Sequence, residues 1–137
     1  MEMPVPDASV LSRKAQIVER LAEVLPRNSV ISDERETRAY ECDALTAYKC
    51  PPLCAVLPAN TKEVADVLRV CHELGVPVVP RGSGTSLAGG ALPTADCVIL
   101  GVAKMNDVIE TNYDDRYIKV QTGRTNLSVT GAVETNG

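Results

Sequence analysis

Residues 76–93 have the sequence VPVVPRGSGTSLAGGALP and carry the strongest structural signal in this chain. The apolar run over residues 76–79 is typical of a short buried strand. The loop that follows is rich in glycine, which adopts positive φ easily and lets a ligand approach the backbone closely. Successive N–H groups in such a turn form a concave site for anions, so we expect the loop to hold a pyrophosphate.

The residues expected to contact this anion lie in the loop over residues 80–93. They combine glycines, small hydroxyl side chains and one cation: Pro80, Arg81, Gly82, Ser83, Gly84, Thr85, Ser86, Gly89 and Gly90. We expect the N–H groups of residues 83–86 to be the donors. For Arg81 two roles stay open, either neutralising the anion or pairing with a carboxylate elsewhere in the protein.

The loop matches neither of the two commoner phosphate-binding motifs. The Rossmann fingerprint requires a third glycine at the position that Leu87 occupies. A Walker A loop requires a lysine after its last glycine, and the sequence has none there. Paired glycines and Pro93 also disfavour a helix directly after the loop. A long connection that needs glycines only for its own turns is the alternative.

A β-α-β unit is predicted to lead into this loop. Residues 53–57, LCAVL, form a short continuous apolar run typical of a buried parallel strand. Asn60 and Glu63 have capping-box spacing for a helix, and Gly75 stands where its C′ residue is expected. The expected buried stripe of this helix is Val64, Val67, Leu68, Cys71 and Leu74. The loop then leaves the carboxyl end of the second strand, where open α/β sheets bind ligands.

The N-terminal region predicts a helix capped by Ser9 and ended by Pro26. Its apolar positions at helical spacing are Leu11, Val18, Leu21, Ala22 and Leu25. The polar, mixed pattern of residues 28–40 does not decide a structure, and residues 43–52 are expected to form a loop.

The C-terminal region predicts a third buried strand over residues 97–102, and then a hairpin and a helix. The hairpin pairs residues 108–109 with residues 117–121, and the helix covers residues 126–134.

The fold class is therefore α/β, or α+β overall: a small parallel sheet with flanking helices, followed by the start of an antiparallel subdomain. We divide the chain into an N-terminal helical segment (1–28), a first α/β subdomain (29–104) and a truncated second subdomain (105–137).

Composition limits the classes of partner and compartment. Net charge is −4 without any Lys/Arg cluster, so nucleic acid is not an expected partner. No apolar run reaches the ~18 residues of a transmembrane helix, and the N-terminus lacks the pattern of a secretory signal. We therefore expect a cytoplasmic protein.

Cysteine and histidine offer no metal or nucleophile set. The odd number of cysteines, five, favours free thiols in a reducing compartment. Cys50 and Cys54 form a C-x-x-x-C pair, but no second pair or nearby histidine completes a metal site. His72 is the only histidine and lies in the helical segment, away from the glycine loop. We expect the cysteines to be structural and assign no metal ligand.

Several stretches, in this order, resemble one known family. They are YECDALTAY (40–48), AVLP (55–58), VCHELG (70–75) and PVVPRGSGTSLAGGALP (77–93), with a weaker echo in VQTGRTNLSVTGAV (120–133). Together they resemble the FAD-binding domain of vanillyl-alcohol-oxidase-type flavoproteins, a fold often called PCMH. The likeness is greatest to the FAD-linked subunit of bacterial glycolate oxidases and to D-lactate and D-2-hydroxyacid dehydrogenases.

The resemblance implies FAD as cofactor, with its pyrophosphate on the loop over residues 80–93. It implies oxidation of a 2-hydroxy acid, of glycolate or D-lactate type, to a 2-oxo acid, and a possible iron–sulfur or other electron-transfer subunit as partner. Some relatives attach FAD to a histidine in or beside this loop, and residues 80–93 contain none, which implies non-covalent FAD. Tyr40, Asp43 and Tyr48 match the YECD segment and are candidates for the flavin border, with a structural loop role as the alternative.

Family members are several times longer than 137 residues, so we expect this chain to be an N-terminal fragment, or a truncated product of a longer gene, with the catalytic residues beyond Gly137. Two other hypotheses stay open. One is a complete, non-catalytic nucleotide- or phosphate-binding module, and the other is an assembly subunit whose glycines serve turns alone.

Overall fold

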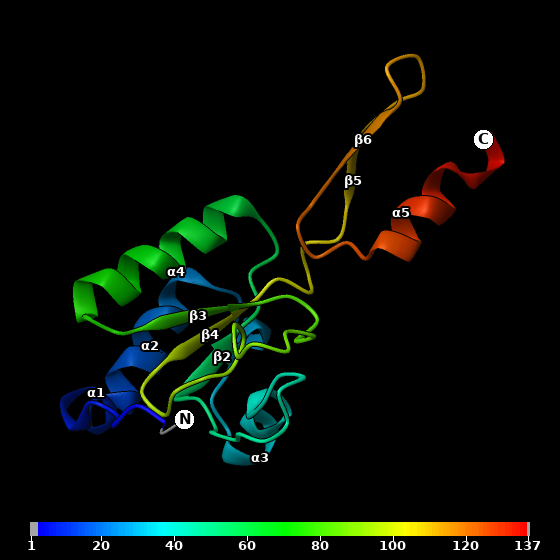
Figure 1. The fold of residues 1–137 in the computed structure, drawn as a ribbon. Coiled ribbons are helices and arrows are strands. Elements are labelled where there is room, and N and C mark those ends of the chain that lie inside the picture. The colour runs from blue at the N-terminus through cyan, green and yellow to red at the C-terminus, as the bar shows by residue number, and fades with distance from the viewer. Residues whose placement is uncertain (1–2, 137) are drawn as a thin grey trace.

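The structure is a computed structural model and describes residues 3–136. Figure 1 shows a mixed α/β body with a hairpin and a helix that project from it. The helices are α1 (Ala8–Ser12), α2 (Lys14–Val24), α3 (Glu34–Thr37), α4 (Thr61–Leu74) and α5 (Asn126–Val133). The strands are β1 (Val30–Ile31), β2 (Cys54–Val56), β3 (Val78–Arg81), β4 (Val98–Gly101), β5 (Val108–Asn112) and β6 (Tyr117–Val120). Short 3₁₀ turns cover Arg27–Ser29, Arg38–Tyr40 and Glu134–Asn136.

The main sheet has the strand order β1-β2-β4-β3. Strands β2 and β3 both pair in parallel with β4, while the short β1 pairs antiparallel with β2. The predicted α/β class and parallel pairing are thus confirmed. However, β2 and β3 are not neighbours, because β4 lies between them although it follows both in the chain. The antiparallel edge strand β1 falls in the segment whose pattern decided nothing.

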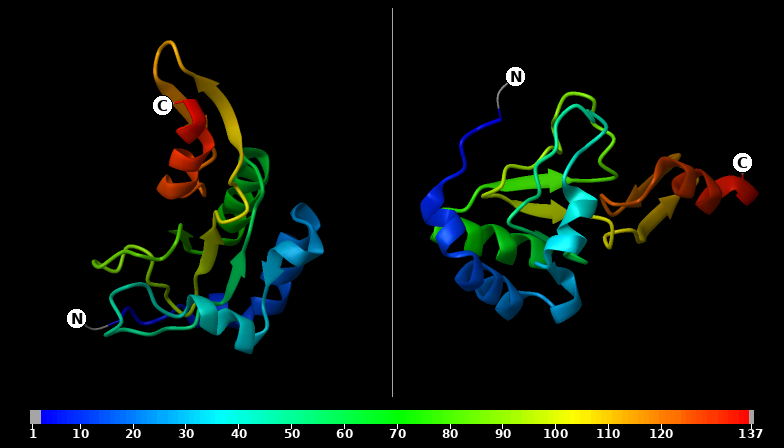
Figure 2. Two further views of the ribbon diagram at one scale, coloured as in Figure 1. Left: turned by 90° about the vertical axis from the view of Figure 1, so that its right-hand side faces the viewer. Right: turned by 90° about the horizontal axis from the view of Figure 1, so that it is seen from below.

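Each face of this sheet buries a different set of side chains, as the alternation of a strand requires. One face packs against α1, α2 and α4, and Figure 2 shows α2 and α4 on that side. This larger core contains Val10, Ile17, Leu21, Leu25, Leu53, Cys54, Val56, Val67, Val70, Cys71, Val76, Val98 and Leu100. The opposite face buries a smaller cluster of Ala55, Cys97 and Ile99, with Ile31, Tyr40 and Val79 packed against it. That second face carries the glycine loop and the segment over residues 40–50.

The N-terminal helix differs from its prediction at both its cap and its middle. Asp7, not Ser9, is the N-cap, because its Oδ1 accepts from the Ser9 N–H at 2.7 Å. The helix breaks at Arg13, whose Nη1 donates to the Leu74 carbonyl at 3.1 Å. The break shifts the buried positions, so Val10 is in the core and the predicted Leu11 is 39% exposed.

Helix α4 begins and ends as predicted. Asn60 Oδ1 accepts from the Glu63 N–H at 2.9 Å, while Glu63 Oε2 accepts from the Ala59 N–H at 2.8 Å. Gly75 has φ of 63°, and the Val76 N–H donates to the Cys71 carbonyl, which forms a Schellman C-cap. The predicted stripe was wrong at Leu68, which is 46% exposed, and it missed the buried Val70.

The C-terminal region is the projecting part of the molecule. Strands β5 and β6 pair antiparallel as predicted, with an irregularity between Val108 and Glu110. Helix α5 begins at Asn126 as predicted and has no buried residue. Gln121 joins the base of the hairpin to the body, since its Nε2 donates to the Ala59 carbonyl at 3.3 Å. Our boundaries at residues 28 and 104 stay predictions.

None of the helices over residues 3–136 combines the length and the apolar character that crossing a membrane requires.

Candidate functional site

The glycine loop begins two residues later than predicted. Strand β3 continues through Pro80 and Arg81, which pair with Leu100 and Gly101 of β4. β3 is an edge strand, and its bonds to β4 run through Pro77 and Arg81. By strand alternation the nitrogen of Pro80 therefore faces the open edge, where no N–H is needed. Of the predicted contact residues, Pro80 and Arg81 belong to the strand, and the loop proper starts at Gly82.

The loop is held open by positive-φ glycines and by one serine. Gly84 and Gly89 have φ of 71° and 77°. The Ser86 Oγ accepts from the Gly90 N–H at 3.0 Å and from the Ala88 N–H at 3.3 Å. Within the described residues, the N–H groups of residues 83–86 donate to no protein acceptor. These are the donors that the sequence singled out for an anion.

Arg81 clamps the loop to the segment over residues 40–50. Its Nη1 donates to the Cys42 carbonyl at 2.7 Å and to the Ala91 carbonyl at 3.4 Å. Its guanidinium carbon lies 5.7 Å from the centroid of the Tyr40 ring, within cation–π range. These partners are carbonyls and an aromatic face, whereas the sequence had suggested a carboxylate partner as one of two roles.

Asp43 reinforces the same connection. The side chain is buried, with Oδ1 accepting from the Leu45 N–H at 2.9 Å and Oδ2 from the Ala91 N–H at 3.3 Å. Of the three YECD-segment candidates, Tyr40 and Asp43 thus support the glycine loop. Tyr48 closes a local turn, through its N–H to the Leu45 carbonyl at 3.4 Å.

A cavity of about 460 Å³ lies at the carboxyl ends of β3 and β4. The start of the glycine loop, the segment after β4 and the turn before α5 form its walls. Its lining residues are Gly82, Ser83, Val102, Ala103, Asn106, Thr122, Gly123, Arg124, Thr125 and Ser128. Five of them carry hydroxyl or amide side chains, one is a cation and none is acidic. This composition suits an anion, at the strand ends where open α/β sheets bind ligands.

Gly123 lets the turn before α5 lie close to the segment that follows β4. Its N–H donates to the Met105 carbonyl at 2.8 Å, and a Cβ at this position would overlap the Val102 carbonyl oxygen. Only glycine therefore allows the turn to pass so close to the segment after β4. Gly123 is not among the predicted contact residues. In the sequence, this residue is a glycine between a predicted strand and a predicted helix. That position indicates a turn but does not show which segment the turn contacts.

Arg124 was also missed, and it is the only cation among the residues that line the cavity. Its Nη1 donates to the Asn106 carbonyl at 2.8 Å and its Nη2 to the Ser128 carbonyl at 3.2 Å. Its Nε is buried without a hydrogen-bond partner, which among the described buried side chains is true of this atom alone. The next residue, Thr125, caps α5.

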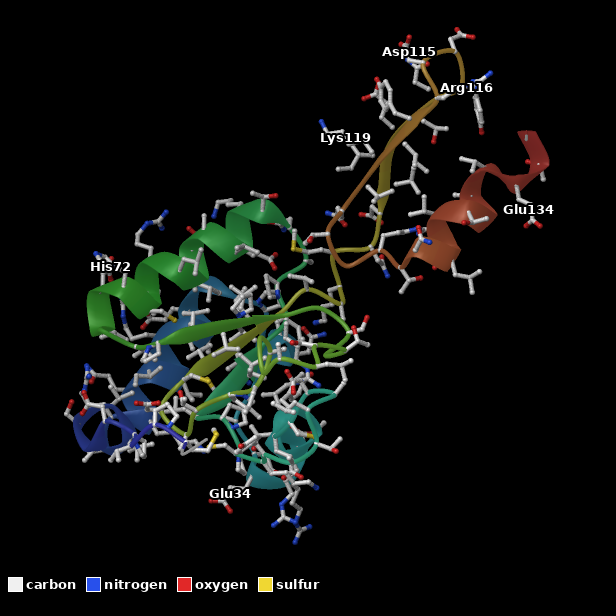
Figure 3. The ribbon with its side chains drawn as sticks, in the orientation of Figure 1. Glu34, His72, Asp115, Arg116, Lys119 and Glu134 are labelled. Carbon is white, nitrogen blue, oxygen red and sulfur yellow. The ribbon has the colours of Figure 1, made fainter. Side chains whose placement is uncertain are left out.

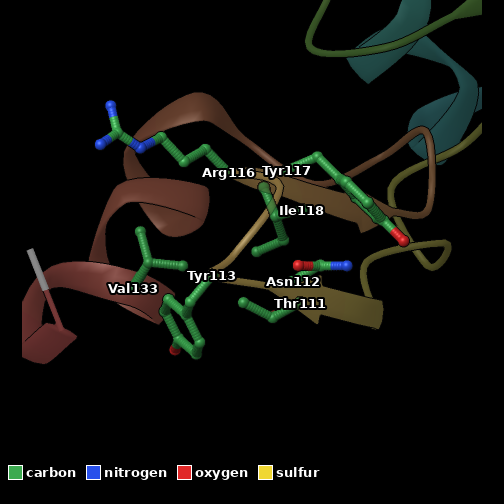
Figure 4. Close-up of a pocket in the computed structure, with 7 residues that line it drawn as sticks. All are labelled: Thr111, Asn112, Tyr113, Arg116, Tyr117, Ile118 and Val133. Atoms are coloured by element: carbon green, nitrogen blue, oxygen red, sulfur yellow. The ribbon is translucent and has the colours of Figure 1, made fainter.

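A second cavity, of about 580 Å³, lies between the β5–β6 hairpin and α5 (Figure 4). Its lining residues are Thr111, Asn112, Tyr113, Arg116, Tyr117, Ile118 and Val133. None of the predicted contact residues reaches it.

The cysteines are free thiols. Burial raises the pKa of Cys54 to about 12 and the pKa values of Cys71 and Cys97 to about 11. These three thiols are therefore protonated at neutral pH and act as small apolar side chains. His72 lies exposed on the outer face of α4 (Figure 3).

Comparison with solved structures establishes the class of fold. p-Cresol methylhydroxylase with bound substrate superimposes with a TM-score of 0.80 at 21% identity, over 96% of this chain and 26% of that one. The 4-ethylphenol oxidase of Gulosibacter chungangensis gives 0.81 at 23% identity, over 96% and 26%. The fold is the PCMH-type FAD-binding fold that the sequence resemblance implied.

Residues 52–137 match the family model described as FAD binding domain, and the chain belongs to this family. It is 40% identical over 120 residues to glycolate oxidase subunit GlcD of Escherichia coli K12, covering 88% of this chain and 24% of that protein. It is 30% identical over 109 residues to D-lactate dehydrogenase of Anaerostipes hadrus, covering 79% and 23%. The chain thus spans about a quarter of the length of these relatives.

Proposed function

We propose that this chain is the FAD-binding portion of a flavin-dependent oxidoreductase that oxidises a 2-hydroxy acid of glycolate or D-lactate type to the 2-oxo acid. The names of its relatives support the reaction class. One structural observation supports the binding role most: unbonded N–H groups over residues 83–86 follow β3, next to a cavity without a carboxylate. A diphosphate supplies the acceptors that these donors lack.

The predicted contact residues take different parts in this proposal. Residues 83–86 present the N–H groups to the diphosphate, each bond with a charged acceptor contributing about 1.5–3 kcal/mol, and Gly82 lines the adjoining cavity. Gly89 and Gly90 shape the return of the loop, with the Gly90 N–H bound to Ser86. Pro80 and Arg81 hold the loop's origin on the sheet, and Asp43 holds its end.

FAD, when bound, supplies the electron acceptor for the hydroxy acid. The chain's own residues bind and orient it. We propose that attachment is non-covalent, since residues 80–93 offer no histidine. No residue of this chain is assigned to catalysis. An iron–sulfur or other electron-transfer subunit is the partner that we propose for the whole protein, in keeping with the word subunit in a relative's name.

The test is a titration of FAD with the longest polypeptide that the gene encodes. Quenching of the flavin fluorescence measures the binding. We expect a saturable FAD complex that Gly84→Trp abolishes, and glycolate- or D-lactate-dependent reduction of a dye acceptor. Absence of FAD binding contradicts the proposal. FAD binding without turnover of any 2-hydroxy acid favours the non-catalytic binding module. Partner capture without any anionic ligand favours the assembly subunit.

A further inference from the structure

The one cation of the glycine loop lies against Gly84 and is already bonded to protein groups. Arg81 is the loop's own cation, but its guanidinium donates to the carbonyls of Cys42 and Ala91 and lies against Tyr40. It does not line the cavity at the strand ends. Arg124 does line that cavity and enters it from the other wall, the turn before α5.

Arg124 is oriented by the protein before any ligand arrives. A guanidinium has five N–H groups, and Arg124 uses one on the Asn106 carbonyl and one on the Ser128 carbonyl. One N–H on each terminal nitrogen is left, and the buried Nε–H has no acceptor. Because the two carbonyls already fix the side chain, a further bond to an anion costs little conformational entropy.

The surroundings of Arg124 favour an anion rather than a carboxylate partner from the protein. No Asp or Glu lines the cavity, in a chain with a net charge of −4. Thr125 and Ser128 line the same wall, with their hydroxyl oxygens 2.7 Å apart. Helix α5 begins directly after Thr125, so its positive dipole end adds to the field there. Gly82 and Ser83 face these groups from the opposite wall.

We propose that Arg124 binds the diphosphate of FAD from one wall of the cavity, opposite Gly82 and Ser83, where the glycine loop begins. This inference rests on the proposed function and adds to it a binding residue outside the glycine loop. It also makes the ligand a bridge between the sheet and α5. Since α5 has no buried residue, the ligand is expected to order the start of this helix.

The experiment compares FAD with riboflavin, which lacks phosphate, on the apoprotein of the full-length gene product. Arg124→Gln is expected to weaken FAD binding at least ~10-fold, as loss of one charge-assisted bond implies, and to leave riboflavin binding within about 2-fold. Arg116→Gln is the matched control, because this arginine lies at the hairpin tip (Figure 3) and does not line the cavity. It is expected to change neither affinity.

A second measurement needs no variant. In hydrogen exchange of the wild-type protein, FAD is expected to protect residues 122–130 and riboflavin is not. Unchanged FAD affinity in a folded Arg124→Gln, or no FAD protection at these residues, overturns the inference but leaves the proposed function standing. Failure of the wild-type protein to bind FAD overturns the proposed function itself.

Discussion

The guanidinium carbon of Arg81 lies 5.7 Å from the centroid of the Tyr40 ring, at the point where the glycine loop leaves β3. The two residues are far apart in the chain. Their contact joins the segment over residues 40–50 to the loop, together with the bond from Arg81 to the Cys42 carbonyl. The segment and the loop therefore form one structural unit on the side of the sheet opposite α2 and α4 (Figure 2).

Arg81→Met is expected to loosen this unit. It removes the bonds to two carbonyls and the cation–π contact, for a loss of about 1–3 kcal/mol in the free energy of unfolding. Urea unfolding measures the stability, and limited proteolysis reports cleavage within residues 82–90. Arg35→Met is the control, because this side chain is exposed on α3, and it is expected to change neither. If Arg81→Met is as stable and as resistant to protease as the wild-type protein, the contacts of Arg81 do not hold the loop to the segment over residues 40–50.

Gly84→Ala is expected to be costly, and Gly82→Ala to be nearly neutral for stability. Gly84 has φ of 71°, and a Cβ there would overlap the Arg81 guanidinium. Gly82 has no positive φ and open space around its Cβ position. We expect Gly84→Ala to lower the free energy of unfolding by about 1–3 kcal/mol. Equal urea midpoints for the two variants would show that the loop conformation described here is wrong.

Gly123→Ala is expected to separate the C-terminal region from the sheet. The new methyl would overlap the Val102 carbonyl oxygen and lie 2.9 Å from that of Met105. Neither backbone atom can move like a flexible side chain, so we expect a loss of about 1–3 kcal/mol. Gly131→Ala in α5 is the control, since open space surrounds it, and is expected to stabilise by about 0.5–1 kcal/mol. Thermal unfolding of both variants measures these opposite changes in stability. A Gly123→Ala variant as stable as the wild-type protein would contradict the close approach at this turn.

Stability is expected to fall as pH rises above about 9. Burial raises the pKa of Cys54 from its ordinary value of 9.0 to about 12 in the folded protein. Above pH 9 the unfolded chain therefore loses this proton while the folded chain keeps it, which favours unfolding. Below pH 9 both states are protonated and the effect is absent. The expected slope is about 1.4 kcal/mol per pH unit for each such thiol.

Urea unfolding of Cys54→Ala and Val56→Ala between pH 8 and 10.5 tests this expectation. Both variants remove buried volume from β2, but only the first removes a titratable group. The slope against pH is expected to be shallower in Cys54→Ala and unchanged in Val56→Ala. If the free energy of unfolding has the same slope against pH in the two variants, groups other than Cys54 cause the loss of stability at alkaline pH.

Local structure was predictable wherever the pattern of neighbouring residues decides it. The Asn60 cap, the Gly75 C-cap, the buried runs of β2 and β4 and the β5–β6 pairing all depend on side chains a few residues apart. The missed Asp7 cap and the exposed Leu11 and Leu68 show the limit of this reasoning. Which apolar residue faces the core depends on where the helix breaks and what packs against it.

The amino-acid sequence by itself determined the class of fold, the glycine loop after β3 and the family, because periodicity, capping and motif order are local properties of the chain. Only the tertiary structure placed β4 between β2 and β3, turned Arg81 toward Tyr40 and brought Gly123 and Arg124 to the same cavity as Ser83. These relationships join residues 20 to 44 positions apart, and no local spacing encodes them. They arise because the sheet buries both of its faces and because only glycine lets the second turn approach the end of β4.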